Sequence, residues 1–183
     1  MNETRKYLNQ YAMLLGTYLG VFWIAKFCLI PAGLTNAFLM MLFIGLTLCV
    51  PFMAHYYTRL YRDRIAGGYI TFTHAWLFYA SMFIYASLLT AVAHYIYLAY
   101  MDNGHIIGTY NEMLNQLKAE QIPGTEGYIN QMREGLELLA GMKPIDLVMQ
   151  QMSNNIFMGL FMGIITAMIV RRKNPKTTEE EQA

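Results

Sequence analysis

Hydrophobic residues gather in four long runs along the chain, separated by shorter polar stretches. The runs cover residues 11–30, 37–57, 75–100 and 145–170. A helix of about 20 apolar residues crosses a bilayer core of about 30 Å, and each run meets that length. Because lipid offers no partner for backbone polar groups, each run must be helical. The pattern therefore predicts an all-α, polytopic membrane protein whose four transmembrane helices form a four-helix bundle.

The longest polar stretch, residues 101–143, separates the third run from the fourth and predicts a helical hairpin. Thr109-Tyr-Asn-Glu112 matches a capping box and predicts the start of the first helix. Thr125 is expected to cap the second helix. The apolar face of this second helix consists of Ile129, Met132, Leu136 and Leu139. Two short amphipathic helices cannot bury such faces alone, so we expect the hairpin to cover its own bundle, dock another protein or lie on the membrane surface.

Composition supports the membrane assignment and excludes several other classes. Of the 183 residues, 56% are hydrophobic and only 14% are charged. A soluble domain carries about 25% charged residues. The chain therefore has too few charges for an ordinary soluble enzyme, a disordered chain or a nucleic-acid-binding protein.

The formal net charge of +1 hides a segregation of charge along the chain. Bases gather before the first run, between the second and third runs, and in the tail of residues 171–183. They are Arg5, Lys6, Arg59, Arg62, Arg64, Arg171, Arg172, Lys173 and Lys176. The 101–143 segment carries six acids against three bases. Since basic residues mark the cytoplasmic side of a multi-pass protein, we expect both termini in the cytoplasm and an extracytoplasmic 101–143 insert.

Small residues at four-residue spacing predict close helix packing in two of the runs. They are Gly16 and Gly20 in the first run, and Gly159, Gly163 and Ala167 in the fourth. Glycine lets two backbones approach closely, so these stripes favour contact between membrane helices. The first and fourth predicted helices run in opposite directions, so they are expected to pair within one chain. A partner protein or a second copy is the alternative contact.

A candidate outer polar site lies near the outer ends of the first and third runs. Lys26 is the one charge well inside a run, and an ionisable group in a membrane suggests function. It either extends to the outer interface or contacts an anion or lipid headgroup. His94 is predicted at a similar depth, with Asp102 and His105 just beyond it. These groups either form a small polar site under the insert, or His94 is an ordinary interface histidine.

The remaining candidate chemistry is limited. Arg59, Arg62 and Arg64 are expected to contact anionic headgroups, or they only reflect membrane topology. Cys28 and Cys49 are predicted at different depths, which argues against a disulfide. No sequence spacing suggests a metal site, a cofactor or a catalytic motif, so we do not expect an enzyme.

One part of the chain is similar to a known family. Arg59-Leu-Tyr-Arg-Asp-Arg64, followed by Gly67-Gly-Tyr-Ile-Thr-Phe-Thr-His-Ala75, resembles the domain-of-unknown-function family 4199 of short bacterial membrane proteins. The stretch Ile169-Val-Arg-Arg-Lys-Asn-Pro175 is similar as well. The resemblance implies four spans, an outer insert before the fourth span and a location in the bacterial cytoplasmic (inner) membrane. It implies no activity.

Two functional hypotheses follow from these features. The first is a non-enzymatic accessory or scaffold protein that acts through helix packing and its outer insert on a membrane-protein partner or a second copy. The alternative is a small transporter or lipid-binding protein in which Lys26 and His94 face an outer-leaflet cavity. An enzyme acting inside the membrane is a third possibility, although no matched acid, base or nucleophile supports it. The direction of the Lys26 side chain, into or out of the bundle, distinguishes the first two.

Overall fold

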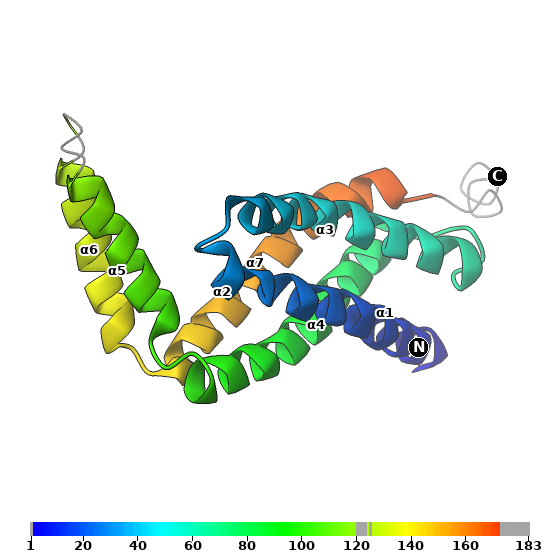
Figure 1. Ribbon diagram of the computed structural model, residues 1–183. Helices are drawn as coiled ribbons and strands as arrows, with labels where there is room; N and C mark the ends of the chain where they lie inside the picture. The colour runs from blue at the N-terminus through cyan, green and yellow to red at the C-terminus, as the bar shows by residue number, and fades with distance from the viewer. Residues whose placement is uncertain (1, 120–123, 125, 173–183) are drawn as a thin grey trace, which may run out of the picture.

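The computed structural model describes residues 2–119, 124 and 126–172, and within them the chain is helical (Figure 1). The helices are α1 (Asn2–Phe27), α2 (Leu29–Gly33), α3 (Ala37–Arg64), α4 (Phe72–Tyr100), α5 (His105–Ala119), α6 (Glu126–Gly141) and α7 (Pro144–Val170). The predicted cap Thr125 and the tail bases Lys173 and Lys176 lie outside the described residues, as do the side chains of Arg5 and Lys6.

Four segments are long and apolar enough to cross a membrane: α1 with α2, then α3, α4 and α7. They coincide with the four predicted runs, and a two-helix insert separates α4 from α7. These findings confirm the predicted all-α class with four candidate spans. The protein is therefore a multi-pass membrane protein.

Local sequence signals explain where most of these helices begin. The Asn36 side chain accepts a hydrogen bond from the Phe38 backbone N–H at 3.0 Å and so caps α3. Thr71 caps α4 in the same way, and Pro144 lies in the first turn of α7. Pro31 has no N–H to donate to the Phe27 carbonyl, which accounts for the break between α1 and α2.

The basic segment after the second run is helical, although the predicted run ended before it. α3 continues to Arg64, about two turns beyond the predicted end at residue 57. Nothing in this segment breaks a helix, and charged residues are accommodated once the helix has left the apolar layer. The chain turns at Gly67 and Gly68, whose φ angles of 71° and 86° are accessible mainly to glycine.

Helix α4 is the centre of the bundle, and both glycine stripes pack against it. A Cβ on Gly16 would lie 2.7 Å from the Met82 carbonyl oxygen of α4. A Cβ on Gly159 of α7 would overlap the ring of Phe83, also on α4. The expected pairing of the first and fourth membrane helices, which are α1 and α7, is therefore wrong, because each of them packs on α4.

The stripes meet α4 through further small residues. Gly20 approaches Ala86, and Gly163 approaches the rings of Trp76 and Tyr79. Ala167 is completely buried in the same core. Removing side chains at these positions brings the backbones of α1 and α7 close to two neighbouring faces of α4.

Helix α3 stands apart from this three-helix core over most of its length. Only 11% of its most apolar segment is buried, against 50% for α4. Its firm attachment is near Arg64, where Tyr61 stacks on Phe78 with ring centroids 4.0 Å apart. The Tyr61 hydroxyl also forms a 2.9 Å hydrogen bond with Nε2 of His74. The separation elsewhere leaves room for a cavity between α3 and the other helices.

Helices α5 and α6 form a hairpin that extends away from the bundle (Figure 1). Leu114, Ile129 and Leu136 are buried between the two helices, so the hairpin has its own small core. A cap folded over the bundle, one of the three arrangements we expected, is therefore not what the structure shows. The predicted capping box is also wrong, because α5 begins at His105 and Thr109 lies inside it.

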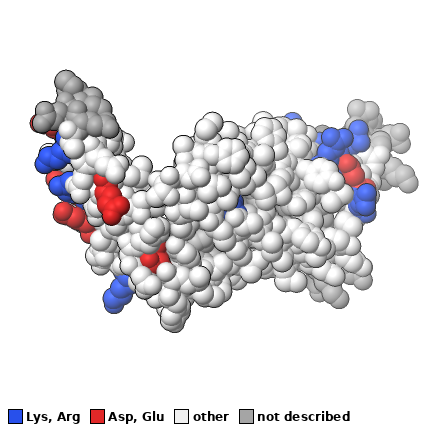
Figure 2. Space-filling view, viewed as in Figure 1, with Lys and Arg blue, Asp and Glu red and all other residues white. Residues whose placement is uncertain are grey.

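On the face that Figure 2 shows, charged side chains gather at the two ends of the molecule, and few charges lie between them. One charged end is the α5–α6 hairpin. At the other end, the backbones of Ile70 and Arg172 pair through hydrogen bonds of 3.1 and 2.9 Å. This bridge joins the α3–α4 turn to the end of α7. α1 begins at this same end, so three basic segments lie together.

Candidate functional site

A cavity of about 280 Å³ lies between α3 and the core helices. Most of its wall is apolar, and a few polar side chains come from all four long segments. The lining residues are Trp23, Lys26, Phe27, Ile30, Phe43, Thr47, Val50, Pro51, Tyr79, Phe83, Thr90, His94, Gln151, Asn155, Met158 and Met162. An apolar cavity with a few convergent polar groups is the usual form of a small-molecule site in a helical bundle.

The Lys26 side chain points into this cavity, toward α3. Its Nζ atom lies 5.1 Å from the ring centroid of Phe43, across the gap between α1 and α3. A cation over an aromatic face is attracted by the ring. Among the described residues, no carboxylate lies within 4 Å of this ammonium group. The cavity therefore contains an uncompensated positive charge.

Three buried polar atoms of the cavity wall have no hydrogen-bond partner in the described part of the chain. They are Nε1 of Trp23, the hydroxyl oxygen of Tyr79 and Nε2 of His94. The ring of His94 packs against Phe27 with centroids 3.7 Å apart, which holds it in place. Buried polar atoms are nearly always paired, so an atom such as Nε2 of His94 is available to a polar group that enters the cavity.

Two amides on α7 complete the polar part of the wall, and the sequence analysis missed both as site residues. Gln151 and Asn155 are four residues apart, so they lie on the same face of α7. This spacing was a visible signal, because two amides on one face of a membrane helix need partners. Trp23 and Tyr79 were missed because aromatic residues are common throughout these spans.

The cavity opens sideways, between α3 and α7. Thr47 of α3 and Met158 of α7 both line it and are both exposed. Pro51, also in the wall, has no N–H to donate to the Thr47 carbonyl, so a backbone acceptor lies beside the opening. This opening faces the region that lipid occupies around the spans.

The structure separates the other two residues of the predicted outer site from this cavity. A carboxylate oxygen of Asp102 accepts a hydrogen bond from the Ile106 backbone N–H at 3.2 Å, in the first turn of α5. His105 is the first residue of α5, and its backbone N–H donates to the Asp102 carbonyl. Lys26 and His94 are thus brought together, while Asp102 and His105 serve the start of the hairpin.

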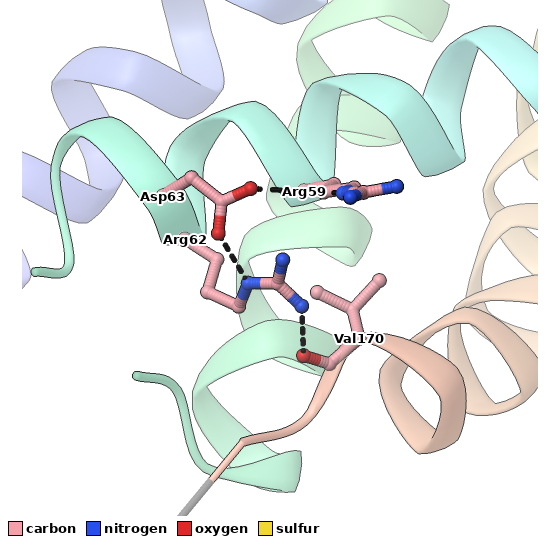
Figure 3. A network of polar contacts seen from close by, with 4 residues as sticks. All are labelled: Arg59, Arg62, Asp63 and Val170. Atoms are coloured by element: carbon pink, nitrogen blue, oxygen red, sulfur yellow. Dashed lines mark hydrogen bonds and ion pairs between the residues drawn. The ribbon is translucent and has the colours of Figure 1, made fainter. Parts of the chain in front are cut away.

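The three arginines predicted to contact headgroups have different surroundings, and Figure 3 shows two of them, Arg59 and Arg62. Arg62 is mostly buried, and its Nη1 donates to the Val170 carbonyl at 3.0 Å, at the end of α7. Its Nε also donates to Asp63 at 2.7 Å. Arg59 lies 3.6 Å from the same carboxylate and is largely exposed, and Arg64 is exposed too. Arg62 therefore links α3 to α7.

The fold and the cavity define a class: a four-span membrane protein with a projecting helical hairpin and a mostly apolar cavity that contains a few polar groups. A family model described as "Protein of unknown function (DUF4199)" matches residues 14–172. The chain belongs to this family, as the resemblance of its basic segment predicted. No curated protein and no solved structure matches it.

Proposed function

We propose that this protein binds the anionic headgroup of a membrane amphiphile in the cavity between α3 and the core helices. The observation that carries the proposal is the direction of Lys26, which faces His94 and other unpartnered polar atoms inside an apolar chamber. This is the lipid-binding alternative considered from the sequence. The proposal concerns binding, or transfer between leaflets, and not catalysis.

The energetics of Lys26 favour an anionic ligand. Holding an ammonium group among apolar side chains is costly unless the charge is paired. Phe43 offsets part of this cost, but an aromatic face compensates less than an anion does. A carboxylate or phosphate placed beside Nζ would pair the charge and accept hydrogen bonds from Trp23 and His94. Hydrogen bonds between charged groups contribute about 1.5–3 kcal/mol each.

The size of the cavity favours an amphiphile over a small ion. At about 280 Å³ it is slightly below the usual range for drug-sized ligands, about 300–1,000 Å³. It therefore suits a headgroup with the first part of one hydrocarbon chain. The rest of the chain would leave between Thr47 and Met158 into the surrounding lipid. The mostly apolar wall, which includes Val50 and Met162, matches the hydrocarbon part.

Tryptophan quenching by brominated lipids tests this proposal directly. Trp23 lines the cavity, whereas Trp76 donates to the Leu160 carbonyl at 3.0 Å outside it. A Trp76→Phe variant leaves Trp23 as the reporter. Dibromostearate should then quench fluorescence saturably in nanodiscs, while the neutral dibromostearamide should bind about ten-fold or more weakly, because one charged hydrogen bond is lost.

Charge variants show whether Lys26 is responsible. Lys26→Gln should weaken dibromostearate binding by about ten-fold or more, and His94→Ala should weaken it less. Lys118→Gln on the distant α5 removes the same charge and should leave binding unchanged. Equal quenching by the acid and the amide, or unchanged affinity in Lys26→Gln, would contradict the proposal.

The proposed setting is the bacterial cytoplasmic membrane, with both termini in the cytoplasm. The clustering of the α3–α4 turn, the start of α1 and the end of α7 at one basic end supports this orientation. The α5–α6 hairpin would then lie outside the cytoplasm, and the cavity would open to the outer half of the bilayer. A reporter enzyme that works only in the cytoplasm should therefore be active when it is fused to either terminus.

An accessory or scaffold role is a second candidate function, favoured by the hairpin. It extends from the bundle and exposes large apolar side chains, including Leu138 (74%) and Tyr128 (62%). Such a surface suits contact with a membrane-protein partner. Affinity purification in mild detergent should recover a specific protein with the native chain and lose it when Leu138 and Tyr128 are replaced by serine. A protein that purifies alone in both forms would contradict this role.

A further inference from the structure

A second pocket, of about 590 Å³, lies at the basic end of the molecule, between the last turns of α3 and α7. Its walls are polar, unlike those of the central cavity. The lining residues are His55, Arg59, Arg62, Asp63, Ile169, Val170, Arg171 and Arg172. The lining residues from α3 and those from the end of α7 are more than a hundred residues apart in the sequence, so only the folded chain brings them together.

The pocket has a strong excess of positive charge. It contains four arginines and a single carboxylate, that of Asp63. Asp63 already pairs with Arg62 at 2.7 Å and with Arg59 at 3.6 Å. Arg171 and Arg172 are exposed, and no carboxylate of the described chain lies within 4 Å of them. Within the described residues, two guanidinium groups are thus available to an anion.

The frame that holds these arginines is well defined (Figure 3). Arg62 donates to the Val170 carbonyl, and this contact fixes α3 against the end of α7. The backbone pairing of Ile70 with Arg172 fixes the position of Arg172 from the other side. A basic loop that only marked membrane topology would need neither contact. The arrangement is therefore more specific than a general surplus of charge.

Two exposed apolar stripes lead from this pocket toward the middle of the spans. On α3, Leu48 and Phe52 are 66% and 76% exposed, and helical spacing places them on the face that carries His55. On α7, Ile165 and Ile169 are 49% and 65% exposed, four residues apart. These stripes extend the polar pocket into the apolar layer, as the chains of a lipid extend its headgroup.

We propose that this pocket binds the phosphate of an anionic membrane phospholipid, whose acyl chains lie along these stripes of α3 and α7. A guanidinium group matches two phosphate oxygens at once, which makes arginine well suited to such a headgroup. Arg59, Arg171 and Arg172 would contact the phosphate, while Arg62 positions the end of α7. The site is separate from the central cavity and does not depend on the function proposed for it.

Native mass spectrometry of the delipidated full-length protein in detergent tests the proposal. Phosphatidylglycerol and phosphatidylcholine with the same acyl chains are the probes. We expect at least a ten-fold preference for phosphatidylglycerol in the native chain. The variant Arg59→Gln/Arg171→Gln/Arg172→Gln should lose this preference, since each base near a membrane surface contributes measurably to anionic lipid binding. It keeps Arg62, so the link between α3 and α7 remains.

A charge-matched control separates a site from a general electrostatic effect. The variant Arg64→Gln/Lys118→Gln/Arg133→Gln removes three charges outside the pocket. It should retain the preference within about two-fold. Equal loss in both triple variants would overturn the proposal. The central cavity, proposed to hold one hydrocarbon chain, should contribute less to the retention of this two-chain lipid. Lys26→Gln should therefore keep most of the preference, so failure of one site is distinguishable from failure of the other.

Two measurements on the native chain keep the proposal testable even where a triple variant does not fold. Equal retention of the two lipids by the native chain would overturn it. Inorganic phosphate at millimolar concentration should displace phosphatidylglycerol only weakly, because free phosphate gains nothing from the apolar stripes. Inorganic phosphate or soluble glycerophosphoglycerol that displaced the bound lipid as strongly as intact phosphatidylglycerol does would show a site for the free headgroup. This result would contradict a lipid site.

Discussion

The contact between Gly159 and Phe83 makes a sharp prediction about how the bundle is held together. An alanine at position 159 would place its Cβ 2.5 Å from Cγ of the Phe83 ring. The ring has little room to move, because it stacks on Tyr79 at 4.7 Å and meets Trp23 edge-on at 5.4 Å. The substitution must therefore push α7 away from α4 or disturb this aromatic group.

The magnitude follows from two opposing effects. Forcing an extra methyl group into a packed core costs about 1–3 kcal/mol. Replacing glycine by alanine inside a helix returns up to about 1 kcal/mol of helix propensity. Gly45 of α3 isolates the second effect, because nothing lies within 4 Å of a Cβ built there. Gly159→Ala should thus be less stable than Gly45→Ala by about 2 kcal/mol.

Thermal unfolding in detergent, followed by the fraction of protein that stays monodisperse, measures this difference. For a chain of this length, 1 kcal/mol shifts Tm by about 2–4 °C, so Gly159→Ala should melt roughly 4–8 °C below Gly45→Ala. In a Phe83→Ala background the ring is gone, and the cost of Gly159→Ala should shrink. Equal Tm values for the two glycine variants would refute the packing argument, as would an unchanged cost without the ring.

Three further predictions address other parts of the structure. In intact cells, an impermeant maleimide should label Cys28, which follows α1 at the end placed outside in the proposed orientation, more readily than Cys49, inside α3; the reverse order would contradict that orientation. Arg62→Ala should lower the free energy of unfolding by about 1–3 kcal/mol, because it breaks the hydrogen bond to the Val170 carbonyl at the end of α7, whereas Arg64→Ala should have little effect. Asp102→Ala removes the side-chain hydrogen bond in the first turn of α5 and should cost about 1 kcal/mol, seen as faster hydrogen exchange in α5 with the bundle unchanged.

Much of the architecture was predictable from local sequence. Four apolar runs of sufficient length had to be helices, because backbone polar groups find no partners in lipid. The hairpin between the last two spans was predicted correctly for similarly local reasons. Two boundaries were wrong. The basic segment up to Arg64 is helical, and the capping box at Thr109 does not start α5, because Asp102 supplies an earlier hydrogen bond.

The sequence by itself determined the spans, the hairpin and the segregation of charge, since these depend only on length, apolarity and the order of residues. Tertiary structure alone decided that α4 is the central helix and that Lys26 faces His94. The physical reason is that lipid is as apolar as a protein core. A membrane helix therefore shows no strong difference between its buried and exposed faces. The packing of Gly16 and Gly159 on α4 determines which faces of α1 and α7 are buried. It thereby determines which side chains of these two helices line the cavity.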